Sequence, residues 1–292
     1  MELVIIQQPE NGILGGPKDK SFLISLNNAN YDIAIKQLCQ REIFISTNDG
    51  IYEDMLSVFY TLETLLMLFD GHFYPTIKAF DGTEITSSWN KRSLSSYRSA
   101  DFMLGSGNKL IEFDAVVDAQ LFQNWHALKK ELDLIHNMVL YCLSSVEMPK
   151  DMQVAFLIEA FKGVCELIHV RNPNFALPLN SKNKLDLKPA FLAIVDRYGL
   201  DIFKEELRKN KEGFAQILVN SRNRIAHIKS WQNRRVLDGG ESVMYLMKLS
   251  LLYRIVLFDL LGISKSTYNV ALTSRVQTIN NHKIMNSFLN SL

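Results

Sequence analysis

Apolar residues recur at every third or fourth position over most of the chain beyond residue 113, and this spacing constrains the fold more than any other feature. The clearest case is the segment 113–144, where one stripe is apolar: Val117, Leu121, Trp125, Leu128, Leu132, Ile135, Val139 and Leu143. Residues three or four apart lie on the same face of an α-helix. The pattern therefore predicts one long amphipathic helix over 113–144 and a largely helical remainder.

Further helices are expected after Pro149, which stands where helices commonly begin. The expected ranges are 154–170, 188–198, 201–210, 212–228 and 241–261, with a shorter helix near 281–292. The segment 172–184 holds two prolines and four asparagines, so it is expected to be a loop. Gly239 and Gly240 are expected to break the chain before the helix over 241–261.

The first third of the chain has a mixed pattern of apolar residues that favours several strands and one helix. Short strands are expected over 3–7, 22–26 and 43–46, and a helix over 51–69 that ends at Asp70-Gly71. The Asp81-Gly82 pair predicts a hairpin within 74–88. Residues 87–108 are rich in Ser, Asn, Gly and Arg and are expected to form a loop or linker.

These two residue patterns, one in each part of the chain, predict a mainly α protein. A small α+β module over residues 1–110 is followed by residues 111–292, which contain an antiparallel helical bundle. The boundary near residue 110 rests on composition alone.

Composition limits the classes of function. Hydrophobic residues make up 47% of the 292 positions, enough to bury a core without disulfides or metals. The net charge of +1 excludes a protein that coats nucleic acid generally, so any contact with nucleic acid must be local. Cys39, Cys142 and Cys165 lie far apart and form no CxxC pair; we expect buried thiols in a reducing compartment.

No membrane segment or signal peptide is expected. The longest apolar stretch, 243–261, is interrupted by Lys248, Arg254 and Asp259, which favours a buried helix over a membrane span. The expected location is cytoplasmic, without a membrane partner.

The segment 213–230 carries the residues best suited to chemistry, and it reads GFAQILVNSRNRIAHIKS. At helical spacing its buried face is expected to consist of Phe214, Ile217, Leu218, Ser221, Ile225 and Ile228. With about 100° per residue, Asn223 and His227 are one turn apart and project away from that face. Arg222 and Arg224 lie on its two flanks.

This group of side chains can cleave RNA. An imidazole with an unperturbed pKa of about 6.5 can take the proton of a ribose 2′-hydroxyl at neutral pH. A guanidinium beside it can hold the scissile phosphate with two hydrogen bonds. An asparagine can orient the imidazole or a phosphate oxygen. Attack by the 2′-oxygen leaves a cyclic phosphate and a 5′-hydroxyl end, and requires no metal or other cofactor.

The pattern Arg222-Asn223-x-x-x-His227 resembles the R-x4-6-H motif of the HEPN superfamily (higher eukaryotes and prokaryotes nucleotide-binding). Long helices expected over 154–170 and 241–261 flank it, as in that superfamily. The stretch of about 149–262 resembles most the HEPN domain of ApeA-type anti-phage defence proteins. A separate module before the HEPN domain also fits their arrangement.

The resemblance implies a metal-independent endoribonuclease that acts as a toxin or defence effector. It further implies a homodimer, in which two motifs line one cleft. Carried over by position, Arg222 and His227 are the catalytic pair and Asn223 is the supporting polar residue.

Some HEPN families add an acidic residue on the first bundle helix, for which Glu159 and Glu166 are candidates. HEPN toxins paired with nucleotidyltransferases carry a tyrosine two residues after the histidine. Lys229 occupies that position here, so control by modification of a tyrosine is not supported.

Basic and aromatic residues around the motif are candidates for RNA binding. Arg224 is assigned this role from helix geometry. Lys229, Trp231, Arg234 and Arg235 suit phosphate binding and base stacking, or equally a solvated loop with one anchoring tryptophan. His126 and His136 are expected to be surface or satisfied core histidines, not metal ligands.

The predicted function is thus RNA cleavage by 2′-hydroxyl attack. Two alternatives stay open: a catalytically silent HEPN-like module that binds RNA or protein, and a structural partner in a toxin–antitoxin pair. His227 also has a simpler explanation, an interaction with the dipole at the end of its helix. Because a constitutively active ribonuclease harms its host, we hypothesise that the 1–110 module restrains the enzyme or senses a trigger.

Overall fold

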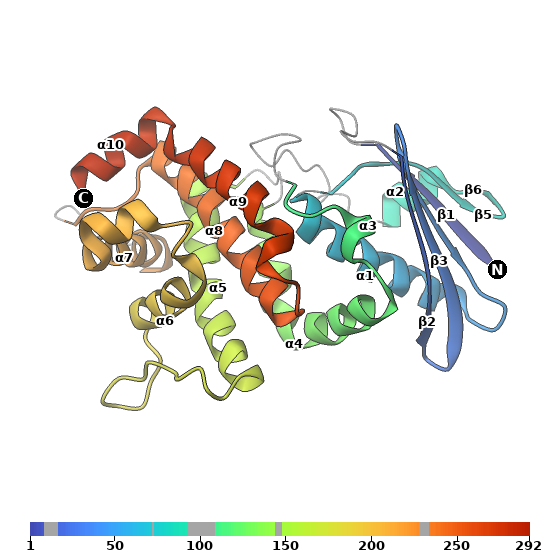
Figure 1. Cartoon of the computed structure of the whole chain (residues 1–292), viewed down its shortest axis with the longest axis horizontal. Coiled ribbons are helices and arrows are strands. Elements are labelled where there is room, and N and C mark those ends of the chain that lie inside the picture. The colour runs from blue at the N-terminus through green and yellow to red at the C-terminus, as the bar shows by residue number, and fades with distance from the viewer. Residues whose placement is uncertain (9–16, 72, 93–108, 144–147, 228–233) are drawn as a thin grey trace. The chain divides into compact units, whose positions relative to one another are not determined.

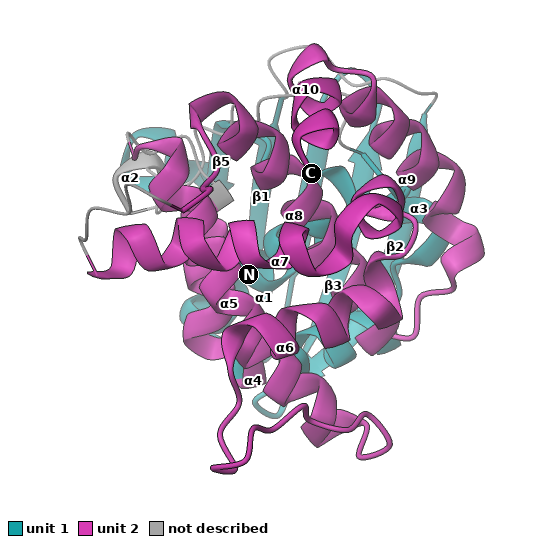
Figure 2. Cartoon of the chain, turned by 90° about the vertical axis from the view of Figure 1, so that its left-hand side faces the viewer, with its two compact units in different colours: residues 1–130, 144–146 teal, residues 131–143, 147–292 magenta. Residues whose placement is uncertain are grey.

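The computed structural model describes residues 1–8, 17–71, 73–92, 109–143, 148–227 and 234–292. They fall into two compact units (Figures 1 and 2): unit 1 holds the described residues up to 130, and unit 2 those from 131 onward. The division falls inside a helix, between residues 130 and 131, whereas the change in composition lies near residue 110. None of the helices described is both long and apolar enough to span a membrane.

Unit 1 is built on an antiparallel sheet of six strands in the order β2-β3-β4-β1-β5-β6 (Figure 1). The strands are β1 (Glu2–Gln7), β2 (Lys18–Leu26), β3 (Ala29–Gln37), β4 (Arg41–Ser46), β5 (Thr76–Asp81) and β6 (Thr83–Glu84). The three expected strands and the hairpin at Asp81-Gly82 are confirmed. Strand β3 was not expected. It pairs with β2 across a two-residue turn at Asn27-Asn28, whose φ values of 50° and 65° suit a type I′ hairpin.

Helix α1 (Tyr52–Asp70) supplies many of the buried side chains in the core of unit 1. Its buried side chains meet the alternate residues of the sheet that are also buried, such as Ile5, Ile33 and Ile43. The buried carboxylate of Asp70 accepts a hydrogen bond of 2.8 Å from Arg41 Nη2. The helix ends at Gly71, which takes φ 79°, so the expected end at Asp70-Gly71 is confirmed.

The segment 113–144 was expected to form one continuous helix, and this prediction is wrong. The chain forms α3 (Phe113–Val116), and then Val117 takes an extended backbone. Asp118 Oδ1 accepts a hydrogen bond of 2.7 Å from the backbone N–H of Leu121, which caps the start of α4 (Ala119–Leu143). A second break lies at Asp133, where φ is 38°. Apolar periodicity alone does not reveal such breaks, because both sides of each break keep their buried stripe.

The expected loop over 87–108 is also wrong at its start, because α2 (Thr86–Arg92) is helical there. Residues 93–108 lie outside the described part, as does the glycine-rich segment 11–16.

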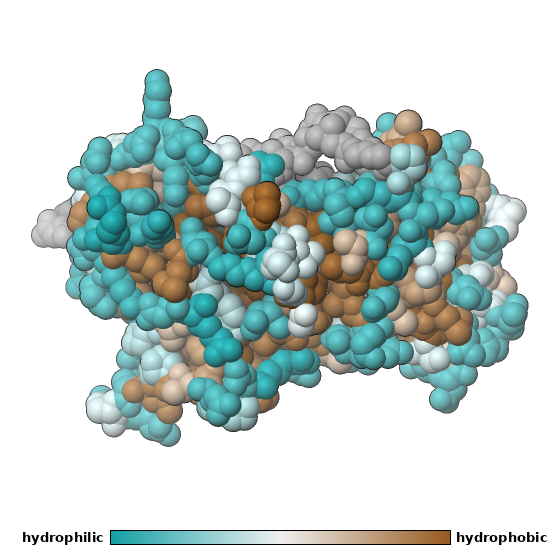
Figure 3. Space-filling view, in the orientation of Figure 1, coloured by the Kyte–Doolittle hydropathy of each residue, from teal (hydrophilic) through white to brown (hydrophobic). Residues whose placement is uncertain are grey.

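Unit 2 is a helical bundle, so the predicted fold class is confirmed. Its helices are α5 (Lys150–Arg171), α6 (Leu187–Ile194) with a π-helical extension (Val195–Gly199), α7 (Lys204–His227), α8 (Gly239–Leu260), α9 (Lys265–Asn280) and α10 (Lys283–Ser291). Helices α5, α7 and α8 pack together, and Figure 1 shows α5 and α8 side by side. On the face drawn in Figure 3, hydrophilic residues cover most of unit 2, with hydrophobic residues visible between them.

A chain of aromatic rings joins these helices in the core of unit 2. The ring contacts run from Phe161 through Phe191, Phe203 and Phe214 to Tyr245 and on to Phe288, with centroids 5.0 to 6.2 Å apart. The core therefore holds the motif helix α7 between its neighbours.

Polar residues set the ends of two of these helices. The break expected between 210 and 212 is confirmed at Asn210, which leaves helical geometry and accepts a hydrogen bond of 2.9 Å from Gly213 N. The break expected at Gly239-Gly240 is wrong, because both glycines lie in the first turn of α8. Asp238 and Glu241 form a capping box that starts this helix.

Several buried polar groups in unit 2 have clear partners. Lys248 and Glu206 are fully buried and form an ion pair, and Tyr245 donates a hydrogen bond of 3.1 Å to the same carboxylate. Burial lowers the pKa of Lys248, and Glu206 opposes that shift. His136 lies in the core, one of its two expected positions, and its Nδ1 is 2.9 Å from the Tyr253 hydroxyl. Helix α8 is therefore a buried helix with charged residues, as its sequence predicts.

The cysteines divide into two kinds. Cys142 and Cys165 are buried, as expected, and burial raises the pKa of their thiols to about 12 and about 11. Cys39 is exposed, so its expected burial is wrong: it lies in the short connection between β3 and β4, outside the packed face of the sheet.

Candidate active site

Helix α7 buries the face opposite to the motif, so the motif residues point away from the core. Phe214, Ile217, Leu218 and Ser221 are all buried, which confirms most of the predicted face. Ile225 is only half-buried, and Ile228 lies outside the described residues. The helix is therefore firmly packed up to the motif and less covered in its last turn.

Two polar side chains just before the motif tie the following chain back to α7. Ser221 Oγ donates to the Ile217 carbonyl and accepts from the Leu237 backbone N–H, both at 2.8 Å. Asn220 Nδ2 donates to the Arg235 carbonyl at 3.1 Å. These anchors were missed in the sequence. The signal that points to them is a polar residue on the predicted buried face, Ser221, with a second polar residue, Asn220, directly before it.

Arg222 is held by two acceptors. Its Nε donates to Glu159 Oε2 of α5 at 2.7 Å, and its Nη1 donates to Asn223 Oδ1 at 2.9 Å. The Arg222 side chain is 23% exposed, and Nη2 donates to no other residue that the structure describes. The guanidinium is thus fixed in orientation while part of its N–H edge stays open to solvent.

Of the two acidic candidates, only Glu159 is bonded to the motif. Glu166 lies two turns further along α5 and is exposed. The contact between α5 and α7 therefore selects Glu159 as the carboxylate partner of Arg222.

His227 is the last residue of α7 and is exposed. It follows Asn223 by one turn, so these two side chains lie on the same side of the helix. Arg222 precedes His227 by five positions, which places the two side chains about 140° apart around the helix axis. The structure bonds Arg222 to Asn223 and Glu159, whereas His227 lies one turn beyond Asn223 and on a different side of the helix from Arg222.

The predicted RNA-binding residues have different surroundings. Arg224 and Arg234 are exposed, while Lys229 and Trp231 lie outside the described part of the chain. Arg235 forms an ion pair with the buried Glu241, and its guanidinium lies 5.5 Å from the centre of the Phe288 ring. The hydrogen bond to Glu241 raises the pKa of Arg235. Arg235 thus has a structural role that was not predicted.

No metal centre is formed by the described residues: nowhere among them do three His, Cys, Asp or Glu side chains gather closely enough to hold a metal ion. The side chains at the motif supply hydrogen-bond donors, one carboxylate and an imidazole.

Comparison with known proteins identifies the second half of the chain. No curated protein and no solved structure matches the sequence. One family model does match, the one described as Apea-like HEPN, over residues 152–267. This range runs from the first turn of α5 through α8 into the start of α9, and it includes Glu159, Arg222, Asn223 and His227. The chain therefore contains an Apea-like HEPN domain over residues 152–267.

Proposed function

We propose that this HEPN domain is a metal-independent endoribonuclease that acts as a toxin or anti-phage defence effector. One observation carries the proposal. Arg222 is oriented by Glu159 and Asn223, keeps open N–H groups, and lies on the helix whose exposed end carries His227. A guanidinium oriented in this way can bind two phosphate oxygens, and an exposed imidazole can move a proton.

In the proposed reaction the 2′-oxygen of a ribose attacks the adjacent phosphorus. The bond from phosphorus to the 5′-oxygen breaks, which leaves a 2′,3′-cyclic phosphate and a 5′-hydroxyl end. One histidine takes the proton of the 2′-hydroxyl, and the departing 5′-oxygen receives a proton in exchange. Arg222 offsets the negative charge that builds on the phosphate oxygens. His227 is the residue assigned to proton transfer, as base or as acid.

We further propose that the active form is a homodimer. Within one chain Arg222 turns toward α5, whereas His227 lies about 140° around the helix. A cleft lined by two copies of the motif contains two histidines, one for each proton transfer. It also contains two guanidiniums for the phosphate. The geometry of a single chain supports this arrangement because Arg222 and His227 point in different directions from α7.

RNA is held locally in this proposal. Arg224 is exposed one turn beyond the Asn220 anchor, and Arg234 is exposed where the chain returns to α7. Lys229 and Trp231 are assigned to the same surface by their positions in the sequence. The module over residues 1–110 is assigned the role of restraining the enzyme or sensing a trigger.

The test is cleavage of an unfractionated RNA pool in EDTA by the purified chain, by His227→Ala and by a matched control, His126→Ala. His126 lies in unit 1 and outside the HEPN domain. The original chain and the control should degrade the RNA, and His227→Ala should not. Equal cleavage by all three proteins would exclude the assigned role of His227.

A second candidate is a silent HEPN-like module that binds RNA or protein without cutting. The observation in its favour is that His227 makes no hydrogen bond to any residue described, so none of these residues orients its imidazole. This candidate predicts RNA binding that depends on Arg222 and Arg224, with the RNA recovered intact.

A further inference from the structure

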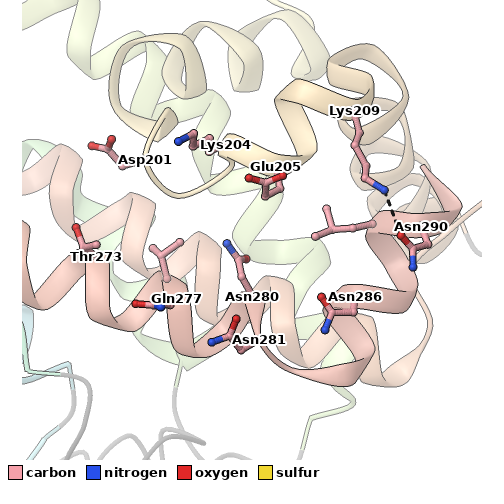
Figure 4. A pocket seen from close by; sticks show the side chains of 12 residues that line it. Asp201, Lys204, Glu205, Lys209, Thr273, Gln277, Asn280, Asn281, Asn286 and Asn290 are labelled. Carbon is pink, nitrogen blue, oxygen red and sulfur yellow. Dashed lines mark hydrogen bonds between the residues drawn. The ribbon is translucent and has the colours of Figure 1, made fainter.

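A groove on unit 2 lies away from the HEPN motif, between the start of α7, the second half of α9 and α10. Figure 4 shows its lining. The groove has a volume of about 650 Å³, within the usual range for small-molecule sites. Residues from these three helices and from the turns beside them line it: Asp201, Lys204, Glu205, Lys209, Thr273, Val276, Gln277, Asn280, Asn281, Asn286, Leu289 and Asn290.

The charges around the groove favour an anion. Its two carboxylates already have cationic partners: Lys265 pairs with Asp201, and Arg208 pairs with Glu205. Lys204 has no ion pair or hydrogen bond with any described residue. Lys209 only donates to an amide oxygen of Asn290, at 3.3 Å, as drawn in Figure 4. Two ammonium groups without a carboxylate partner therefore face a groove whose acidic groups are already neutralised.

The remaining polar lining consists mainly of five carboxamides, four of them in α9 and α10 and the fifth, Asn281, between these helices. Figure 4 shows Asn280 pointing from α9 toward the α7 side of the groove. Its Oδ1 is buried and accepts no hydrogen bond from the residues described. Buried polar atoms in proteins are nearly always satisfied, so this oxygen is suited to a donor from a ligand or an ordered water. Carboxamides both donate and accept, and they match hydroxyl groups and base edges.

We propose that this groove binds a small phosphate ester whose organic part carries several hydrogen-bonding groups, the class that includes sugar phosphates and nucleotides. Lys204 lies beside Asp201 and Lys209 beside Asn290, at different ends of the groove (Figure 4), so one of the two lysines holds the phosphate as a point charge and the other adds positive charge at the far end. Asn280 and its neighbouring carboxamides bind the polar organic part, and the side chains of Val276 and Leu289 give it a small apolar wall. The site does not use Arg222 or His227, so it goes beyond the proposed ribonuclease.

The test is calorimetric titration of the full chain with four compounds: ribose 5-phosphate, adenosine 5′-monophosphate, adenosine and inorganic phosphate. At least one phosphate ester should bind saturably with a Kd at or below about 1 mM. Adenosine and inorganic phosphate should each bind at least about tenfold more weakly, because each lacks one half of the recognised chemistry. Binding as tight to adenosine as to its phosphate would overturn the assignment of the lysines.

Variants locate the site. Of Lys204→Gln and Lys209→Gln, the variant that removes the phosphate contact should weaken binding of the phosphate ester by about tenfold or more, and the other should weaken it less. Lys182→Gln, at an exposed lysine of the loop after α5, should leave binding unchanged. Asn280→Leu should also lose the ligand, while its thermal unfolding temperature without ligand stays equal or rises because the orphaned oxygen is gone. The proposal is overturned if no phosphate ester binds, or if Lys204→Gln and Lys209→Gln bind as tightly as Lys182→Gln. None of these results depends on cleavage of RNA.

Discussion

Glu159 on α5 and Arg222 on α7 form an ion pair in which the carboxylate Oε2 lies 2.7 Å from the guanidinium Nε. Their side chains are 37% and 23% exposed, so the pair contributes little to stability, at most about 1 kcal/mol. Its main effect is orientation. It links the motif helix to the preceding long helix and aims the rest of the guanidinium outward.

Replacing this carboxylate should reduce cleavage without unfolding the domain. Glu159→Gln keeps the size of the side chain but loses its charge, so Arg222 is held less firmly. We expect kcat/KM for an RNA substrate to fall about tenfold, with the free energy of unfolding changed by less than about 1 kcal/mol. Glu166→Gln on the exposed part of α5 is the matched control and should behave like the original chain. If Glu159→Gln cleaves at the full rate, Glu159 is not a positioning residue.

A lysine at position 222 should not replace the arginine. The guanidinium donates to Glu159 and Asn223 through different nitrogens and still has N–H groups left for phosphate. An ammonium group is a single point of charge and cannot make this fork of bonds. Arg222→Lys should lower the single-turnover rate by about 100-fold or more. Arg224→Lys, whose side chain is exposed, should lose less than about tenfold. Similar losses in both variants would indicate that general charge, and not the orientation of Arg222, is what matters.

The anchor at Ser221 should matter for stability. Its hydroxyl is buried and bonds both the Ile217 carbonyl and the Leu237 N–H, so Ser221→Ala leaves a buried N–H without its acceptor. We expect a loss of about 1 to 2 kcal/mol in the free energy of unfolding, measured with urea. Ser274→Ala, at an exposed position of α9, should change it by less than about 0.5 kcal/mol. An unchanged value for Ser221→Ala would mean that this hydrogen bond is not formed in solution.

Thiol reactivity should separate the three cysteines. Burial raises the pKa of Cys142 to about 12 and of Cys165 to about 11, so at pH 8 almost none of either is thiolate. Iodoacetamide should therefore modify only the exposed Cys39 in the folded chain, and all three after unfolding in urea. Mass spectrometry of peptides gives the answer. Modification of Cys142 or Cys165 at the rate of Cys39 would contradict their burial.

The sequence predicts those parts of the fold in which one periodicity is sustained. Helices α5, α7 and α8 were predicted because their apolar stripes are long. Helix α9 was missed, since its few buried residues stand among polar ones: Tyr268, Leu272, Val276 and Ile279. Strand β3 was missed because Asp32 and Lys36 interrupt its apolar residues and the Asn27-Asn28 turn was not recognised.

The sequence predicted only those features of the candidate site that lie within helix α7. Spacing correctly assigned the buried face of α7, and so the outward direction of the motif. It did not tell which flank faces α5, because the partner of Arg222 lies 63 positions earlier in the chain. The structural role of Arg235 was not predicted for the same reason, because its bond to Glu241 depends on how the chain enters α8. Contacts of this kind are set by tertiary packing, which periodicity does not encode.

The most direct test of the central claim is expression of the original chain and of His227→Ala in a bacterial host, followed by mapping of RNA ends. The account predicts growth arrest and new 5′-hydroxyl ends with the original chain. It predicts neither with His227→Ala at an equal level of protein. Equal growth and identical RNA ends from the two chains would contradict the assignment of this domain as a ribonuclease that uses His227.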